Sequence, residues 1–249
     1  MPRSFSYSAL TLRVKPSGQS NREAWFLTAE EGVLRATVFG GPKSRLRAQV
    51  GPFHEGTLWI YHDPVRDSRK VIDFDVQSYR PGIRELYERA MTADAVAETI
   101  LASHGGGGGW PEAAKLAGNV MDSLDGADAA LCSRLGIYFL WHWSGVLGVR
   151  PELSVCASCF CELRRDEALW YAAGNETLFC ENCVRKETPP SVLRLGPGAR
   201  LWLTGIESLT PSALARVTLD SPSLEQAKLL SKAVLAGALE KRLATWDSI

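Results

Sequence analysis

Two pairs of cysteines constrain the fold of this chain more than any other feature of its sequence. Cys156 and Cys159 form one C-x2-C pair, Cys180 and Cys183 form a second, and 20 residues separate the pairs. A tight turn lets each pair point two thiolates at one centre, so the spacing predicts one structural zinc ion. Four thiolates close the tetrahedron and leave no open position for water. A redox C-x-x-C pair and a chance spacing are the alternatives.

The segment between the two pairs is typical of a small hairpin. Residues 168–171 and 177–179 are expected to be short strands around a turn at 174–175, which would bring the pairs together. A cytosolic chain rarely keeps structural disulfides, and this favours a metal site. We interpret Cys161 as a bystander and Cys132 as a small buried residue on the apolar face of a helix.

The first 80 residues have the patterns of β-strands. Leu10, Leu12 and Val14 alternate with polar residues, which is the period-two pattern of a half-buried strand. Glycine and proline separate the runs. Five short strands in this length fit a small closed barrel such as an OB-fold, and an SH3-like barrel would have the same spacing. The predicted strands are 10–15, 24–28, 33–39, 55–62 and 71–76.

After Pro81 the apolar residues recur at the spacing of an amphipathic helix. The five glycines 105–109 interrupt this pattern and predict a mobile loop. Near the C-terminus we expect Ser221 to cap a helix that has Pro222 at its first position. The predicted helices span 83–100, a segment beginning at Trp110, 128–147 and 221–238.

These patterns predict an α+β multidomain chain, in which a five-stranded barrel precedes a mainly helical domain with an inserted zinc module. The predicted domains are residues 1–80 for the barrel, 81–153 and 189–249 for the helical part, and 154–188 for the insert.

The net charge is zero, with 28 basic and 28 acidic side chains, and this excludes a histone-like polycation. The charge is uneven: residues 1–80 have 12 basic and 8 acidic side chains, a balance of +4. The longest uncharged apolar stretch, 135–149, has 15 residues, whereas a membrane span needs about 20. The start of the chain has no secretory pattern, so we expect a cytoplasmic protein without a membrane partner.

Seven cations in the first third could converge on one face of a barrel and neutralise phosphates. These candidate DNA-binding residues are Arg13, Lys15, Arg22, Arg35, Lys43, Arg45 and Arg47. Four aromatic residues, Trp25, Phe39, Trp59 and Tyr61, could stack on bases in the same barrel. Alternation does not decide which face they take, and we favour the core for each of them.

The sequence lacks the catalytic motifs that would indicate an enzyme. It has no phosphate-binding loop, since Gly40–Ser44 imitates only the end of one, and no dinucleotide, metalloprotease or nucleophile-elbow motif. The four histidines stand apart, and His142 lies between two tryptophans, which favours a place in the core. We therefore predict a binding protein and not an enzyme.

The order of the parts resembles the RecO family of bacterial recombination mediators. The matching segments are Ala9–Arg13, Gly18–Arg22, Leu27–Gly32, the basic loop Gly40–Arg47, Gly51–Phe53, and Gly148–Leu153 before the first cysteine pair. The resemblance implies an N-terminal OB-fold, a helical remainder and an inserted four-cysteine zinc module.

The resemblance also implies a function in DNA repair and homologous recombination. Proteins of this family bind single- and double-stranded DNA, anneal complementary strands, and act with RecR and in some pathways RecF. They help the recombinase RecA, indirectly, to displace single-strand-binding protein, whose acidic C-terminal tail docks on the helical part. A cytoplasmic, nucleoid-associated location follows from this role.

Two other classes of function stay open at this point. A zinc-ribbon module of the transcription or translation machinery would use the barrel to bind RNA or protein. A metal-dependent hydrolase would need an open coordination position at a cysteine-rich site. A preference for structured RNA over single-stranded DNA would indicate the zinc-ribbon module. Chemistry on a metal-bound water would indicate the hydrolase.

Overall fold

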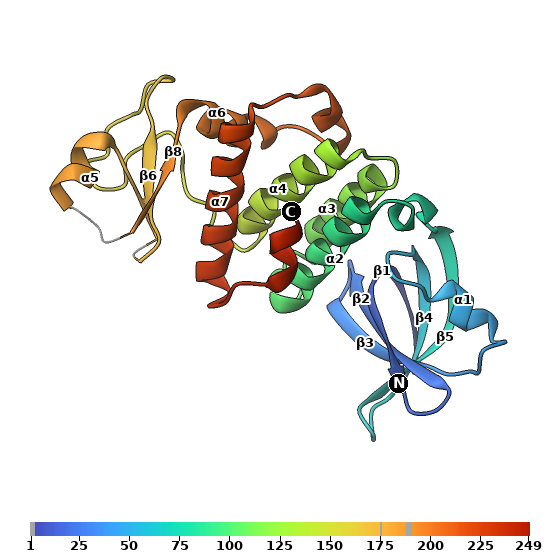
Figure 1. Ribbon diagram of the computed structural model, residues 1–249. Helices are drawn as coiled ribbons and strands as arrows, with labels where there is room; N and C mark the ends of the chain where they lie inside the picture. Colours follow the sequence, from blue (N-terminus) through green and yellow to red (C-terminus); the bar gives the residue numbers. More distant parts are fainter. Residues whose placement is uncertain (1–2, 175, 188–190) are drawn as a thin grey trace. The chain divides into compact units, whose positions relative to one another are not determined.

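The computed structural model describes residues 3–174, 176–187 and 191–249. The chain divides into two compact units, Met1–Gly126 and Ala127–Ile249. The first contains a closed β-barrel followed by helices, and the second contains helices and a small sheet next to a cluster of four cysteines (Figure 1). The predicted fold class is therefore confirmed.

The barrel of the first unit has the strand order β1-β2-β3-β5-β4, closed by pairing of β4 with β1. Strands β3 and β5 run parallel and pair at Thr37 and Lys70, whereas the other neighbours are antiparallel. The short helix α1 (Arg45–Gln49) lies between β3 and β4. This order is that of an OB-fold. The strands are β1 (Ser4–Ser17), β2 (Asn21–Thr28), β3 (Gly32–Val38), β4 (Glu55–Asp63) and β5 (Ser68–Ser78).

Alternation along the strands fills the barrel. In β3, Leu34, Ala36 and Val38 are buried while Arg35 between them is exposed. The rings of Phe26 and Phe74 meet edge to face at 5.9 Å inside. Full burial of one such side chain stabilises a fold by about 1.5–3 kcal/mol, so this alternation also sets which face of each strand points inward.

The prediction that four barrel aromatics lie in the core is wrong. Phe39 is 46% exposed and Trp59 is 36% exposed. Trp25 and Tyr61 are partly buried. Trp25, Trp59 and Tyr61 each follow a buried residue on their strands, and Phe39 follows Val38, the buried last residue of β3. A side chain one position away from a buried residue points to the opposite face. The four rings therefore belong to the outer surface of the barrel.

The helices of the first unit follow the barrel. A 3-10 turn, η1 (Pro81–Arg84), is separated from α2 (Tyr87–Ala102) because Leu86 has an extended backbone. Helix α3 spans Trp110–Leu124. The structure places the predicted mobile loop in a tight turn, in which Gly105–Gly108 all have positive φ. A Cβ on Gly105 would lie 3.1 Å from Cγ2 of Val33, so this turn packs against the β2–β3 hairpin.

The second unit contains the longest helices of the chain. Its helical segments are α4 (Ala129–Val146), α6 (Pro197–Ile206), η2 (Pro211–Arg216), α7 (Ser221–Ala238) and η3 (Ala244–Ser248). Asp128 caps α4 by accepting a hydrogen bond from the amide of Leu131 at 2.7 Å. Asp220, and not the predicted Ser221, caps α7. Within the described residues, the helices are all too short or too polar to span a bilayer.

Two sequence predictions concern residues of α4. Cys132 is 1% exposed, as expected of a small apolar residue. His142 is partly buried, with its ring 4.0 Å from that of Tyr138 and its Nε2 3.1 Å from the Ile206 carbonyl oxygen. Burial lowers the pKa of His142, so the neutral ring is favoured at this position.

The predicted hairpin between the cysteine pairs is present in the second unit. Strand β6 (Leu169–Ala172) pairs antiparallel with β7 (Thr177–Phe179), and Asn175 of the predicted turn lies outside the described residues. Strand β8 (Val192–Leu195), which the sequence patterns miss, adds to the other side of β6. Helix α5 (Glu181–Glu187) follows β7 directly. We call residues 154–187 the cysteine module.

Candidate functional site

The fold of the cysteine module brings the two C-x2-C pairs together. The Sγ atoms of Cys156, Cys159, Cys180 and Cys183 all lie within 4.8 Å of one another. The first pair lies on a turn. In the second pair, Cys180 lies between β7 and α5, and Cys183 lies in the first turn of α5. β6 and β7 form a hairpin between the two cysteine pairs. Their strand pairing brings the turn of the first pair close to the start of α5. The spacing of the four sulfur atoms is compatible with a metal site.

Backbone amides support the sulfur atoms. The amide of Cys180 donates a hydrogen bond to Sγ of Cys156 at 3.2 Å. Phe160, which follows the first pair, has a φ of 59°, and this left-handed residue turns the chain back toward the sulfur atoms. A backbone hydrogen bond from Cys161 is the main reason that the pKa of Cys159 falls to about 6. These donors favour the thiolate at Cys159, which is the form of cysteine that binds metal.

Cys161 contributes its backbone to this turn. Its carbonyl oxygen accepts a hydrogen bond from the amide of Cys156 at 3.0 Å. A hydrogen bond to Cys159 raises the pKa of the Cys161 thiol to about 12, which keeps this side chain protonated. Among the described residues, Cys161 is outside the group of four close sulfur atoms.

A buried arginine connects the cysteine module to the helices of the same unit. Arg200 on α6 is 4% exposed and donates to the Leu153 carbonyl at 3.2 Å and to the Arg164 carbonyl. These two carbonyls flank the first cysteine pair in the chain. The sequence contains no local signal for this role, because Arg200 is 36 residues from its nearest partner.

Three of the candidate DNA-binding cations lie on strands β1 and β3. Arg13 of β1 and Arg35 of β3 are both in register with Trp25 of β2, and Lys15 holds its Nζ 5.9 Å from the centre of the Trp25 ring. Arg35 and Lys15 are exposed, and Arg35 has an ion pair with Glu23 at 3.5 Å. Burial raises the pKa of Asp94 on α2, and the nearby charge of Arg13 opposes part of this shift.

The other four candidate cations meet at α1. Lys43 and Arg45 are exposed and Arg47 is partly buried. Arg22 at the start of β2 donates a hydrogen bond to the Arg47 carbonyl, so its guanidinium holds α1 against the barrel. Burial, with the nearby charge of Arg47, lowers the pKa of Arg22.

Lys70 on β5 is a surface cation that sequence reasoning missed. Its Nζ lies 5.4 Å from the ring centre of Phe39 and 6.0 Å from that of Tyr61. The strand pattern could have shown it, since Lys70 precedes the buried Val71 in an alternating strand. A groove of about 390 Å³ lies next to it on the barrel. Its lining includes Glu23, Arg35, Thr37, Asp67 and Arg69.

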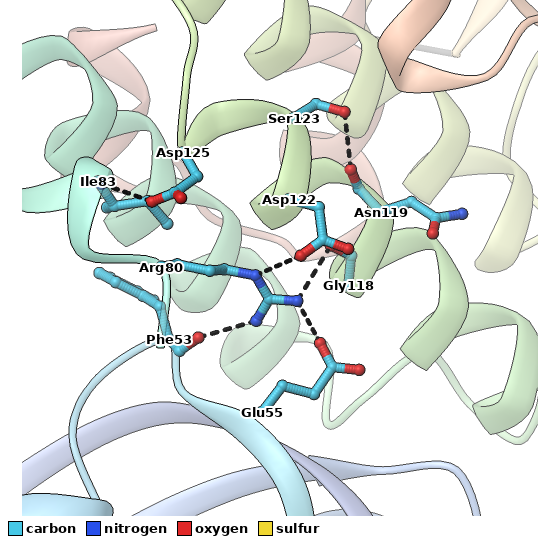
Figure 2. A network of polar contacts seen from close by, with 9 residues as sticks. All are labelled: Phe53, Glu55, Arg80, Ile83, Gly118, Asn119, Asp122, Ser123 and Asp125. Carbon is cyan, nitrogen blue, oxygen red and sulfur yellow. Dashed lines mark hydrogen bonds and ion pairs between the residues drawn. The ribbon is translucent and has the colours of Figure 1, made fainter. Parts of the chain in front are cut away.

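A second missed arginine joins the barrel to α3 in the first unit. The side chain of Arg80 is 3% exposed. Its Nε donates to Asp122 at 2.7 Å, its other nitrogens donate to the Phe53 carbonyl at 2.9 Å and to Glu55, and the Gly118 carbonyl lies at 3.5 Å (Figure 2). Beside it, Asp125 accepts a hydrogen bond from the amide of Ile83 at 3.2 Å. This network is structural, because all three guanidinium nitrogens donate to groups inside the protein.

An OB barrel with basic and aromatic side chains on its surface, followed by helices and a four-cysteine module, defines a class of proteins rather than one activity. Comparison with known proteins identifies the family within this class. Residues 84–247 match the family model described as "Recombination protein O C terminal", so the chain belongs to the RecO family, whose role is DNA repair and recombination.

Curated relatives agree with this family. The chain is 26% identical over 199 residues to the DNA repair protein RecO of Desulfitobacterium hafniense strain DSM 10664 / DCB-2. The match covers 78% of this chain and 70% of the relative. The protein of the same name from strain Y51 matches equally well.

Proposed function

We propose that this chain is a recombination mediator that binds single- and double-stranded DNA, anneals complementary strands and helps to load RecA on DNA coated with single-strand-binding protein. The observation that supports this most is the combination of cations and aromatic rings on the outside of an OB barrel. Cations neutralise phosphates of two strands at once, and this reduces their repulsion without chemical energy. The chain acts by binding and not as an enzyme.

The proposal includes the partners and the boundaries of the parts. RecR, and RecF in some pathways, would bind this chain, and RecA would be a partner only indirectly. The barrel 1–80 would bind DNA, the helical residues 81–153 and 189–249 would hold the tail of single-strand-binding protein, and 154–188 would be the metal module. Residues 188–190 at the last boundary lie outside the described residues. The location would be the cytoplasm, at the nucleoid.

The metal that fits the four cysteines best is zinc. A zinc–sulfur bond of about 2.3 Å sets the sulfur atoms of a regular tetrahedron about 3.8 Å apart. The Sγ atoms of Cys159 and Cys180 are 3.9 Å apart, which is near this value and far above the length of a disulfide bond, about 2.05 Å. We propose one structural zinc ion bound by Cys156, Cys159, Cys180 and Cys183.

The basic residues around α1 give the first test. Replacing Lys43, Arg45 and Arg47 together with alanine should weaken DNA binding for all sequences. Each lost phosphate contact should lower the slope of log K against log salt by roughly 0.7 to 0.9. The measurement is fluorescence anisotropy with labelled oligonucleotides across a salt series.

A matched control separates a site from a general effect of charge. The same number of charges is removed from the second unit by replacing the exposed Lys186, Arg216 and Lys241 with alanine. This control should bind DNA like the wild type. An unchanged affinity and slope for the α1 variant would move the DNA site away from this part of the barrel.

Annealing of DNA coated with single-strand-binding protein gives the second test. We expect annealing of complementary strands without ATP, because no step needs nucleotide hydrolysis by this chain. Annealing should fall when the acidic tail of single-strand-binding protein is removed. Equal rates with the intact and the truncated protein would contradict docking of the tail, and a requirement for ATP would contradict annealing by charge neutralisation alone.

A further inference from the structure

On the outer surface of the barrel, an ammonium group lies over aromatic rings at two places. Lys70 lies over the rings of Phe39 and Tyr61, from β5, the end of β3 and β4. Lys15 lies over the ring of Trp25, on β1 and β2. The pairing Thr37–Lys70–Tyr61 connects β3, β5 and β4, so the Lys70 cluster lies across three neighbouring strands.

These rings contribute less to the stability of the fold than buried rings would, because they are exposed to water. Phe39 is 46% exposed, and Trp59, two residues before Tyr61 on the same face of β4, is 36% exposed. The barrel core is complete without them, since Phe26, Phe74, Leu58 and other side chains fill it. An aromatic patch with cations at its edges, on a protein that meets DNA, fits a ligand that has both flat apolar faces and negative charges.

We infer that Phe39, Tyr61 and Trp25 form a base-stacking surface that selects single-stranded DNA, with Lys70 and Lys15 binding the phosphates between the stacked bases. An ammonium group over an exposed ring is held weakly, and a hydrogen bond to a phosphate is stronger, so DNA would draw each lysine off its ring and free the ring face for a base. In duplex DNA the bases are already stacked on each other and offer no free face. The site therefore discriminates between the two forms of DNA, and this inference rests on the proposed DNA-binding function.

The test compares single- and double-stranded DNA with one double variant. Phe39→Ala with Tyr61→Ala in the full chain should weaken binding of an oligothymidylate by roughly 5- to 100-fold for each lost stack, and should leave duplex affinity unchanged. Lys70→Met should also weaken the single strand more than the duplex. The matched control is Tyr87→Ala, which removes a ring that is 71% exposed on α2 and should change neither affinity. Thermal unfolding followed by circular dichroism shows that each variant is folded.

An oligonucleotide without bases isolates stacking from charge. The wild type should bind an abasic strand more weakly than an oligothymidylate of equal length, and the double variant, which keeps Trp25, should lose most of this preference. Equal loss of single-strand and duplex binding, or a double variant that prefers the strand with bases as strongly as the wild type does, would overturn the stacking surface while the proposed function stands. A wild type that binds neither form of DNA would overturn the proposed function itself.

Discussion

Replacing Cys156 or Cys183 with serine should release the metal and unfold the cysteine module. Thiolate–zinc bonds in small modules supply folding free energy on the order of 10 kcal/mol, and the module has only a small apolar core of its own around Phe179 and Val184. We expect one zinc ion per chain in the wild type and none in either variant. Elemental analysis of the purified protein measures the zinc content. Hydrogen exchange of residues in β6, β7 and α5 measures the unfolding of the cysteine module.

Cys161→Ser is the matched control for this prediction. It changes an exposed thiol that lies outside the group of four close sulfur atoms, and it keeps the backbone hydrogen bond from the amide of Cys156 to the carbonyl of residue 161. This variant should keep its zinc and its protected amides. A wild type without zinc, or a Cys161→Ser variant that loses zinc as fully as Cys156→Ser, would refute the assignment of the four ligands.

The second large effect is expected at Arg80. Replacement with methionine removes the guanidinium and leaves the Phe53 carbonyl, Glu55 and Asp122 without their partner. Breaking a buried ion pair costs about 3–5 kcal/mol, and we expect the lower end because the carboxylates of Glu55 and Asp122 are partly exposed to water. Urea denaturation measures the loss in the free energy of unfolding, and hydrogen exchange of the barrel amides shows that this loss falls in the first unit.

Arg69→Met removes a cation from the surface of the same barrel and is the control for Arg80. Its ion pair with Glu31 at 3.4 Å is partly exposed to solvent, so this variant should lose no more than about 1 kcal/mol. An Arg80→Met variant as stable as Arg69→Met would show that the barrel and α3 stay together without the buried guanidinium.

The sequence by itself determined the cysteine site and the barrel. Ligand spacing in two C-x2-C pairs and a hairpin between them are local, so the cluster at Cys156 and Cys183 could be predicted without knowledge of distant contacts. The alternation of apolar and polar residues is also local, and it predicted five strands. It left the OB-fold and the SH3-like barrel open, because strand order is a property of pairing between distant segments.

Only the tertiary structure decided which face of a strand is inside and what each buried cation contacts. Phe39 and Tyr61 are apolar enough for a core, but strand pairing placed their neighbours inward and left these rings beside Lys70 on the surface. Arg80 and Arg200 look like ordinary surface residues in the sequence. Their partners lie 25 to 47 residues away in the chain, so the burial and pairing of these guanidinium groups exist only once the segments have packed together.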